Sequence, residues 1–282
     1  MTEIQVTEIR STNRVWEVDA LRGFLILFVV FDHFMFDLWM FRTSFVTEFG
    51  KMLGNFAHTQ YYNGSAVLGS LRNLTHDSFV YAFVFISGMS CCFSRNNFKR
   101  ALRLIIFALA LTLVTFVATK IGFEGILISF NVLHVLGLSV LLWACIEKLL
   151  PHLKKNWQKN VYGVTISAVM IAILVVGFYF LEYPCNNSHF WIVFVEHGNN
   201  PIAAFSPGDF LPFFPSFAFF LGGVYLGRFL YPNRETLFPS VSERAVAPLT
   251  FLGRKSIWVY FASQVIALAV LYTLSGAVLG WL

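Results

Sequence analysis

The stretch RVWEVDALRGFLILFVVFDHFMFDLWMFR, residues 14–42, decides the fold class. The hydrocarbon core of a bilayer is about 30 Å thick, and a helix needs about 20 mostly apolar residues to cross it. We therefore predict a transmembrane helix here. Each ionisable group deep in that core costs about 2.5–3.5 kcal/mol on insertion scales. A span that only held the chain in the bilayer would not keep so many, so we also expect this helix to carry a functional site.

Helical geometry shows which ionisable groups of this stretch share a face. At 100° per residue, one stripe contains Asp19, Arg22, His33 and Asp37. Asp32 points about 100° away from His33. Asp37 follows His33 at the i,i+4 spacing at which side chains meet. His33 lies about 21 Å beyond Asp19 along the helix axis.

The composition of the whole chain also indicates a membrane protein. The 282 residues are 57% hydrophobic and 12% charged, with 33 Phe, whereas soluble domains carry about 25% charged residues. The pI of about 9.1 would suit a nucleic-acid partner, but the basic residues lie between apolar spans, which is typical of membrane proteins. We see no short apolar segment with a small-residue cleavage site before Asp19, so we expect the first span to stay in the membrane.

The apolar segments predict an all-α, polytopic transmembrane bundle. Seven spans are expected, at about 14–42, 78–94, 101–119, 125–146, 161–181, 211–230 and 256–276. A long loop is expected over about 42–77, and a polar stretch over 182–210. We find no internal repeat, so we predict a single domain over 1–282, with a polar N-terminal tail over 1–13.

The distribution of positive charge predicts the orientation. If the N-terminus is cytoplasmic, sixteen of the 20 Lys and Arg residues lie inside, and four lie outside: Arg42, Lys51, Arg72 and Lys120. Cytoplasmic segments of membrane proteins carry such an excess of Lys and Arg. Asp19 and Arg22 then lie near the cytoplasmic face, and His33 and Asp37 lie in the outer part of the membrane.

His33 is the strongest catalytic candidate. A neutral imidazole can take a proton from an attacking amine or hydroxyl, and its ordinary pKa near 6.5 suits that task. Asp37 could hold the ring tautomer and stabilise the imidazolium. The alternative is a structural histidine bonded to a backbone carbonyl or to a serine on another helix.

The other ionisable groups of the first span each allow two interpretations. The first interpretation of Asp19 and Arg22 is an i,i+3 ion pair at a helix start, where an acidic residue interacts favourably with the helix dipole. A direct catalytic role is their second interpretation. Asp32 faces away from the stripe and could pair with another helix, or with Arg42 or Arg72.

Polar groups outside the first span supply the remaining candidates. A basic cluster follows the second span and contains Arg95, Lys99, Arg100 and Arg103. Contact with anionic lipid on the cytoplasmic side explains it most simply, but it could equally hold the phosphates of a nucleotide-like donor. Asp209 and His197, in the outer polar stretch, could bind a polar acceptor. His134 stands alone on an apolar face, which is more typical of a satisfied core residue.

Several kinds of site have no signal in the sequence. The four cysteines show no C-x-x-C spacing, so we expect neither a zinc site nor a disulfide framework; they are Cys91, Cys92, Cys145 and Cys185. We interpret them as small buried apolar residues. We expect no metal cofactor, and we find no P-loop, no dinucleotide-binding glycine motif after a strand and no G-x-S-x-G.

Five stretches, in order along nearly the whole chain, resemble one family. VDALRGFLILFVVFDHFMFDL (18–38) resembles the first span of the membrane acyltransferases related to heparan-α-glucosaminide N-acetyltransferase, in their bacterial branch. The other four are FVFISGMSCCFSRNNFKRALRLIIFALALTLVTF (83–116), ILISFNVLHVLGLSVLL (126–142), FFPSFAFFLGGVYLGRFLY (213–231) and LGRKSIWVYFASQ (252–264).

The resemblance implies an enzyme of a bacterial inner membrane that transfers an acetyl group from cytoplasmic acetyl-CoA to a sugar amine or hydroxyl on the far side. The partners it implies are the lipid bilayer and a carbohydrate or glycolipid acceptor, with no nucleic acid and with a homo-oligomer as one option. The chain also resembles the acyltransferase-3 clan, in which the spacing from Asp19 to His33 carries the catalytic role onto His33. Many bacterial members have histidines where this chain has Lys255 and Ser263, while Gln264 is kept.

The mechanism that we expect runs across the membrane. The CoA phosphates bind at the basic cluster and the pantetheine arm reaches between helices to His33. His33, oriented by Asp37, deprotonates the acceptor or briefly carries the acyl group, in a tunnel that keeps water from the thioester. The alternative function is a proton-coupled transporter or channel that uses the intramembrane Asp and His residues, although no repeat symmetry or pair of broken helices supports it.

Overall fold

The computed structural model describes residues 15–122, 126–149, 165, 168–169, 172–173, 206 and 209–275. These residues form helices and short helical turns, and their one strand-like feature is an isolated bridge between Phe130 and Phe210. Within the described residues, five helical segments are long and apolar enough to cross a membrane: Trp16–Met40, Val67–Phe93, Asn97–Lys120, Phe213–Leu230 and Ser256–Leu274. The predicted class, an all-α bundle of membrane helices, agrees with this architecture.

Most predicted spans correspond to a helix. These are α1 (Trp16–Met40), α3 (Val67–Met89) with the 3-10 turn η3 (Ser90–Phe93), α4 (Asn97–Lys120), α5 (Val132–Leu149), α9 (Phe213–Leu230) and α11 (Ser256–Leu274). α5 takes the place of the fourth predicted span but is not among the five membrane-length segments. The fifth predicted span, 161–181, lies mostly outside the described residues.

The predicted loop over 42–77 is wrong, because most of it is helical. It contains η1 (Arg42–Ser44), α2 (Glu48–Phe56), the π-helical turn η2 (Ala57–Tyr61) and the start of α3. Thr47 caps α2 by accepting a hydrogen bond from the backbone N–H of Gly50 at 3.1 Å. The last part of the predicted loop is the start of α3, where Arg72 and His76 pair with a carboxylate of α1.

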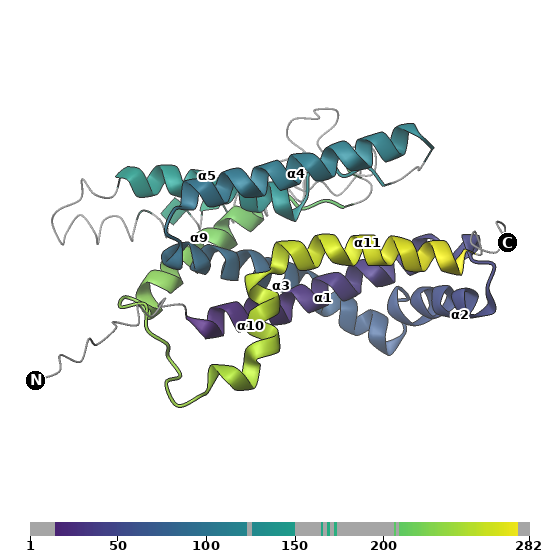
Figure 1. Ribbon diagram of the computed structural model, residues 1–282, viewed down its shortest axis with the longest axis horizontal. Coiled ribbons are helices and arrows are strands. Elements are labelled where there is room, and N and C mark those ends of the chain that lie inside the picture. Colours follow the sequence, from purple (N-terminus) through teal and green to yellow (C-terminus); the bar gives the residue numbers. More distant parts are fainter. Residues whose placement is uncertain are drawn as a thin grey trace, which may run out of the picture.

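The helices pack mainly as three pairs: α1 with α10 (Ala247–Arg254), α3 with α9, and α4 with α5. α11 continues from α10 and runs along α1. Figure 1 shows α4 and α5 as one layer, with α1, α3 and α11 in the opposite layer and α9 between them. The buried core follows the same contacts, with Ile26 of α1, Val84 of α3 and Phe220 of α9 almost fully enclosed.

Two of the pairs depend on glycines that let backbones touch. In the α1–α10 pair, a Cβ at Gly23 would meet the carbonyl oxygen of Leu249, and one at Gly253 would meet that of Asp19. In the α3–α9 pair, a Cβ at Gly223 would meet the carbonyl oxygen of Phe85. Small residues at membrane helix crossings permit this close approach, and here they bring the polar residues of α1 and α3 to the other helices.

Gly223→Ala is expected to destabilise the protein, because the new methyl group faces a backbone carbonyl that cannot rotate away. Overpacking of this kind costs about 1–3 kcal/mol. The unfolding temperature of the detergent-purified protein measures the effect. Gly64→Ala is the matched control, since its nearest neighbour is the movable side-chain nitrogen of Asn73 at 3.1 Å. Equal unfolding temperatures for the two variants would contradict the role assigned to Gly223.

Candidate functional site

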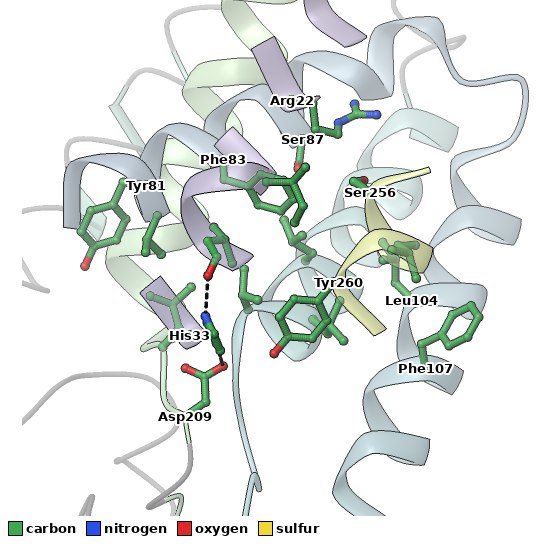
Figure 2. A pocket seen from close by; sticks show the side chains of 18 of the residues that line it. Arg22, His33, Tyr81, Phe83, Ser87, Leu104, Phe107, Asp209, Ser256 and Tyr260 are labelled. Carbon is green, nitrogen blue, oxygen red and sulfur yellow. Dashed lines mark hydrogen bonds and ion pairs between the residues drawn. The ribbon is translucent and has the colours of Figure 1, made fainter. Parts of the chain in front are cut away.

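A cavity of about 470 Å³ lies between the helix pairs, and Figure 2 shows part of its lining. It is lined by α1, α3, α4, α5, the segment before α9 and the junction of α10 with α11. One end carries basic side chains: Arg22, Arg100, Arg103, Arg254 and Lys255. The other end carries His33, His76, Asp77 and Asp209. Arg22 and His33 are about 16 Å apart along α1, given a rise of 1.5 Å per residue, so the cavity joins two chemically different regions.

His33 is held in one orientation at the second end of the cavity. Its Nδ1 lies 2.9 Å from the carbonyl oxygen of Val29. A carbonyl oxygen only accepts, so Nδ1 carries the hydrogen and Nε2 is left to act as a base. The Tyr260 ring meets the imidazole edge-to-face, with centroids 5.6 Å apart. His33 thus makes the carbonyl contact of a structural histidine while its second nitrogen faces the cavity.

The carboxylate beside His33 comes from Asp209, and the predicted partner Asp37 does not reach it. Asp209 Oδ2 is 3.7 Å from His33 Nε2 (Figure 2). Within the described part of the chain, the Asp37 side chain makes no hydrogen bond or ion pair, although it is one turn from His33. The i,i+4 rule places two side chains on the same face, but a ring that turns back to its own helix carbonyl is aimed elsewhere. The structure thus gives Asp209 the position beside Nε2, and the role of Asp37 in orienting His33 stays a prediction.

A polar network holds Asp209 in place. Asn131, which is fully buried, donates to Asp209 Oδ2 at 3.1 Å. His134 lies 3.0 Å from Asn131 Oδ1 and 3.2 Å from the Thr112 hydroxyl. The hydroxyl of Ser206 donates to the backbone carbonyl of Asp209. His134 thus has polar partners, as predicted for a core histidine, and it supports Asp209 through Asn131.

Asp32 is paired with α3, which is one of the alternatives that the sequence left open. Arg72 Nε lies 2.8 Å and His76 Nε2 lies 3.2 Å from its carboxylate. The hydroxyl of Tyr61 donates to Asp32 at 2.8 Å, and the Arg72 guanidinium lies 4.3 Å above the ring of Tyr62. Burial and the neighbouring Asp32 carboxylate raise the pKa of Tyr61 well above its usual range, so its hydroxyl remains a donor.

Asp19 and Arg22 form the predicted i,i+3 ion pair, at 3.7 Å. Each also reaches another element. Asp19 pairs with Arg254 at 3.2 Å, and Arg22 donates to the hydroxyl of Ser90. Burial acts to lower the pKa of Arg254, but its bonds to Asp19 and Glu243 outweigh this and raise it. These contacts support the structural interpretation of Asp19, while Arg22 also lines the basic end of the cavity.

The basic cluster after the second span divides into two parts. Arg100 and Arg103 line the cavity, whereas Arg95 and Lys99 do not. Arg95 precedes α4, which begins at Asn97, and Lys99 in the first turn of α4 lies outside the lining of the cavity. The sequence missed Arg254 and the side chain of Lys255 as contributors, because they arrive from the far end of the chain. His197 lies outside the described residues.

Asp32→Ala is expected to destabilise the protein by about 3–5 kcal/mol, because it leaves the Arg72 charge without its partner at membrane depth. The double variant Asp32→Ala/Arg72→Ala should be more stable than the single one. Unfolding of the purified protein in a denaturing detergent measures both. Lys51→Ala breaks an exposed 2.9 Å ion pair with Glu48 and serves as the control, and it should leave the stability nearly unchanged. Additive effects of the Asp32 and Arg72 changes would contradict the pairing.

Comparison with known proteins identifies the family. Residues 49–265 match the family model described as heparan-alpha-glucosaminide N-acetyltransferase, catalytic. The matched segment contains Asp209, Arg100, Arg103 and Lys255 but begins after α1, so it does not include His33. No match was found among curated proteins or among solved structures. Because the matched segment covers well over half of the chain and the fold is a bundle of apolar helices, the chain belongs to the heparan-alpha-glucosaminide N-acetyltransferase catalytic-domain family of membrane acetyltransferases.

Proposed function

We propose that the protein transfers an acetyl or other acyl group from cytoplasmic acyl-CoA to an amine or hydroxyl of a carbohydrate-like acceptor on the outer side of a bacterial inner membrane. One observation carries the proposal: a single cavity connects a basic region to a histidine whose available nitrogen faces a carboxylate. The family supports acetyl transfer in general. The acyl-CoA donor and the carbohydrate acceptor are implied by the family resemblance, and the roles of the residues are inferred from the cavity.

The basic end of the cavity fits the phosphates of the donor. Among the described residues, neither Arg103 nor Lys255 has a carboxylate within ion-pair distance, although both line the cavity. Arg100 is held by the Ser87 carbonyl at 3.2 Å and can still present its guanidinium to the cavity. Arginines bind phosphate in bidentate fashion, and lysine binds it as a point charge. Arg95 and Lys99 lie outside this lining and suit contact with anionic lipid.

The other end of the cavity fits the transfer step. The acceptor nitrogen or oxygen attacks the thioester carbonyl carbon while its proton passes to His33 Nε2. The carbon–sulfur bond then breaks, and the departing CoA sulfur takes the proton from His33. Asp209 stabilises the imidazolium that exists between the two proton transfers. Tyr260 and the apolar side chains between the two ends, such as Leu104 and Leu136, keep water from the thioester.

His33→Ala is expected to abolish acyl transfer and leave the fold intact, because His33 is the one histidine within ion-pair distance of Asp209 among the residues that the structure describes. Transfer of radiolabelled acetyl from acetyl-CoA to glucosamine in proteoliposomes measures activity, and the unfolding temperature reports folding. Full activity in this variant would contradict the role of His33. Proton flux without any acyl donor would instead favour the transporter.

Variants of the two carboxylates Asp209 and Asp37 test which of them assists His33. Asp209→Asn should lower kcat by about 100-fold or more with little change in KM, since removal of a group that stabilises charge in the transition state acts on kcat. Asp37→Asn should change kcat much less. The opposite order would restore Asp37 as the partner of His33.

Arg103→Ala/Lys255→Ala should weaken acetyl-CoA binding by about 10- to 100-fold, because each lost charge-assisted hydrogen bond contributes about 1.5–3 kcal/mol and the remaining arginines compensate in part. Donor-dependent thermal shift of the purified protein measures the affinity. Arg95→Ala/Lys99→Ala removes the same net charge from positions outside the cavity and should leave the affinity within about twofold, a difference of a few tenths of a kcal/mol. Equal losses in the two double variants would contradict the assignment of the donor site.

A further inference from the structure

A second, smaller cavity of about 190 Å³ opens between α1 and α3. Its walls are mostly apolar and include Phe28, Phe31, Leu68, Leu71 and Phe79. Phe31 is 50% exposed and Leu71 is 54% exposed on the surface of the structure. Both helices are long and apolar enough to cross a membrane, and such surface faces hydrocarbon when the helices are in the bilayer. This second cavity is named the lateral pocket.

The lateral pocket adjoins the main cavity. Val29, His33, His76 and Val80 line both of them. The polar lining of the lateral pocket comes from Asp32, Tyr61, Arg72, Thr75 and His76. A molecule in the lateral pocket therefore meets both apolar side chains and polar groups, and His33 is among the residues that line the pocket.

We propose that the acceptor is lipid-linked: its hydrocarbon chain occupies the lateral pocket, and its carbohydrate head group passes His76 to reach His33. This inference rests on the proposed acyl transfer and names the substrate class. A soluble sugar would gain nothing from walls of Phe28, Phe31 and Leu71, whereas a lipid chain between these side chains keeps its apolar environment. The head group of such a molecule would lie at the same depth as His33, because the two cavities share that residue.

The two cavities also suit different substrates, the donor in the main cavity and the acceptor chain in the lateral pocket. The basic side chains that suit an anionic donor line the main cavity at the Arg22 end, and none of Arg22, Arg100, Arg103, Arg254 and Lys255 lines the lateral pocket. The lateral pocket carries Arg72, whose charge is already matched by Asp32 at 2.8 Å. Donor and acceptor would therefore approach His33 from different directions, without competing for one entrance.

Photolabelling tests the location of the acceptor. The probe is an alkyl glucosaminide with a diazirine in its alkyl chain, added to proteoliposomes of the full-length protein. We expect labelling of residues 61–80 that dodecyl glucosaminide prevents and methyl glucosaminide does not. Binding of the acceptor in the lateral pocket would be contradicted if residues 61–80 were labelled no more strongly than the lipid-facing residues Leu109 and Leu113 of α4.

A matched pair of tryptophan variants separates the pocket from its surroundings. Leu71→Trp fills the lateral pocket. It should reduce two quantities by about tenfold: the labelling, and the preference in kcat/KM for dodecyl over methyl glucosaminide. A tenfold reduction is the effect of losing contact with two methylene groups. Leu74→Trp is the control, because Leu74 is 76% exposed on the same helix and lines neither cavity. It should change neither quantity.

A preference of the unmodified protein for dodecyl glucosaminide does not by itself show that the alkyl chain binds in the lateral pocket, because a long chain also concentrates the acceptor in the bilayer. Equal effects of Leu71→Trp and Leu74→Trp would overturn the inference. Acetyl transfer to dodecyl glucosaminide that neither variant alters would overturn the lipid-linked acceptor and leave the proposed acyl transfer standing. Selective labelling without transfer from acetyl-CoA would instead contradict the proposed function and identify a lipid site alone.

Discussion

The cost of an unpaired charge inside a membrane governs this structure. α1 carries carboxylates and basic groups along its whole length, and most of them are matched by a different element. Asp19 meets Arg254 of α10, Asp32 meets Arg72 of α3, and His33 meets Asp209 before α9. A buried ion pair adds little net stability, but the loss of one partner is expensive. The polar contacts of α1 therefore specify which helices surround it more than they strengthen the bundle.

The sequence was informative where the argument used one helix at a time. Rotation at 100° per residue correctly separated Asp32 from the stripe that contains His33, and Arg72 was among the partners foreseen for Asp32. The same reasoning placed Asp37 on the face of His33, but helical spacing places only the Cβ atoms and does not fix the ring of His33, which turns to the carbonyl of Val29. The start of α3 was missed for a related reason: its polar residues lower the local hydropathy, and their partner lies on another helix.

Contacts between distant segments could not be read from the sequence. Asp209 was foreseen as a residue that binds an acceptor, but its place beside His33 depends on Asn131 and on the pairing of residue 130 with residue 210. The basic end of the cavity combines Arg100 and Arg103 with Arg254, which is brought to α1 by the close crossing at Gly253. Such an arrangement becomes visible only once the helix crossings are known.

The division into tightly and loosely joined helices also has a consequence for movement. α1 and α10, and α3 and α9, meet backbone to backbone at glycines and cannot slide without collision. The α4–α5 pair reaches the rest of the bundle mainly through α5, against α9 and α3, and Figure 1 shows it as a separate layer. Arg100, Arg103 and Leu104 lie on that pair and line the main cavity. The wall of the main cavity that α4 and α5 form carries part of the proposed donor site and is joined less tightly to the other described helices, so a rigid displacement of α4 and α5 together would admit a bulky molecule most easily.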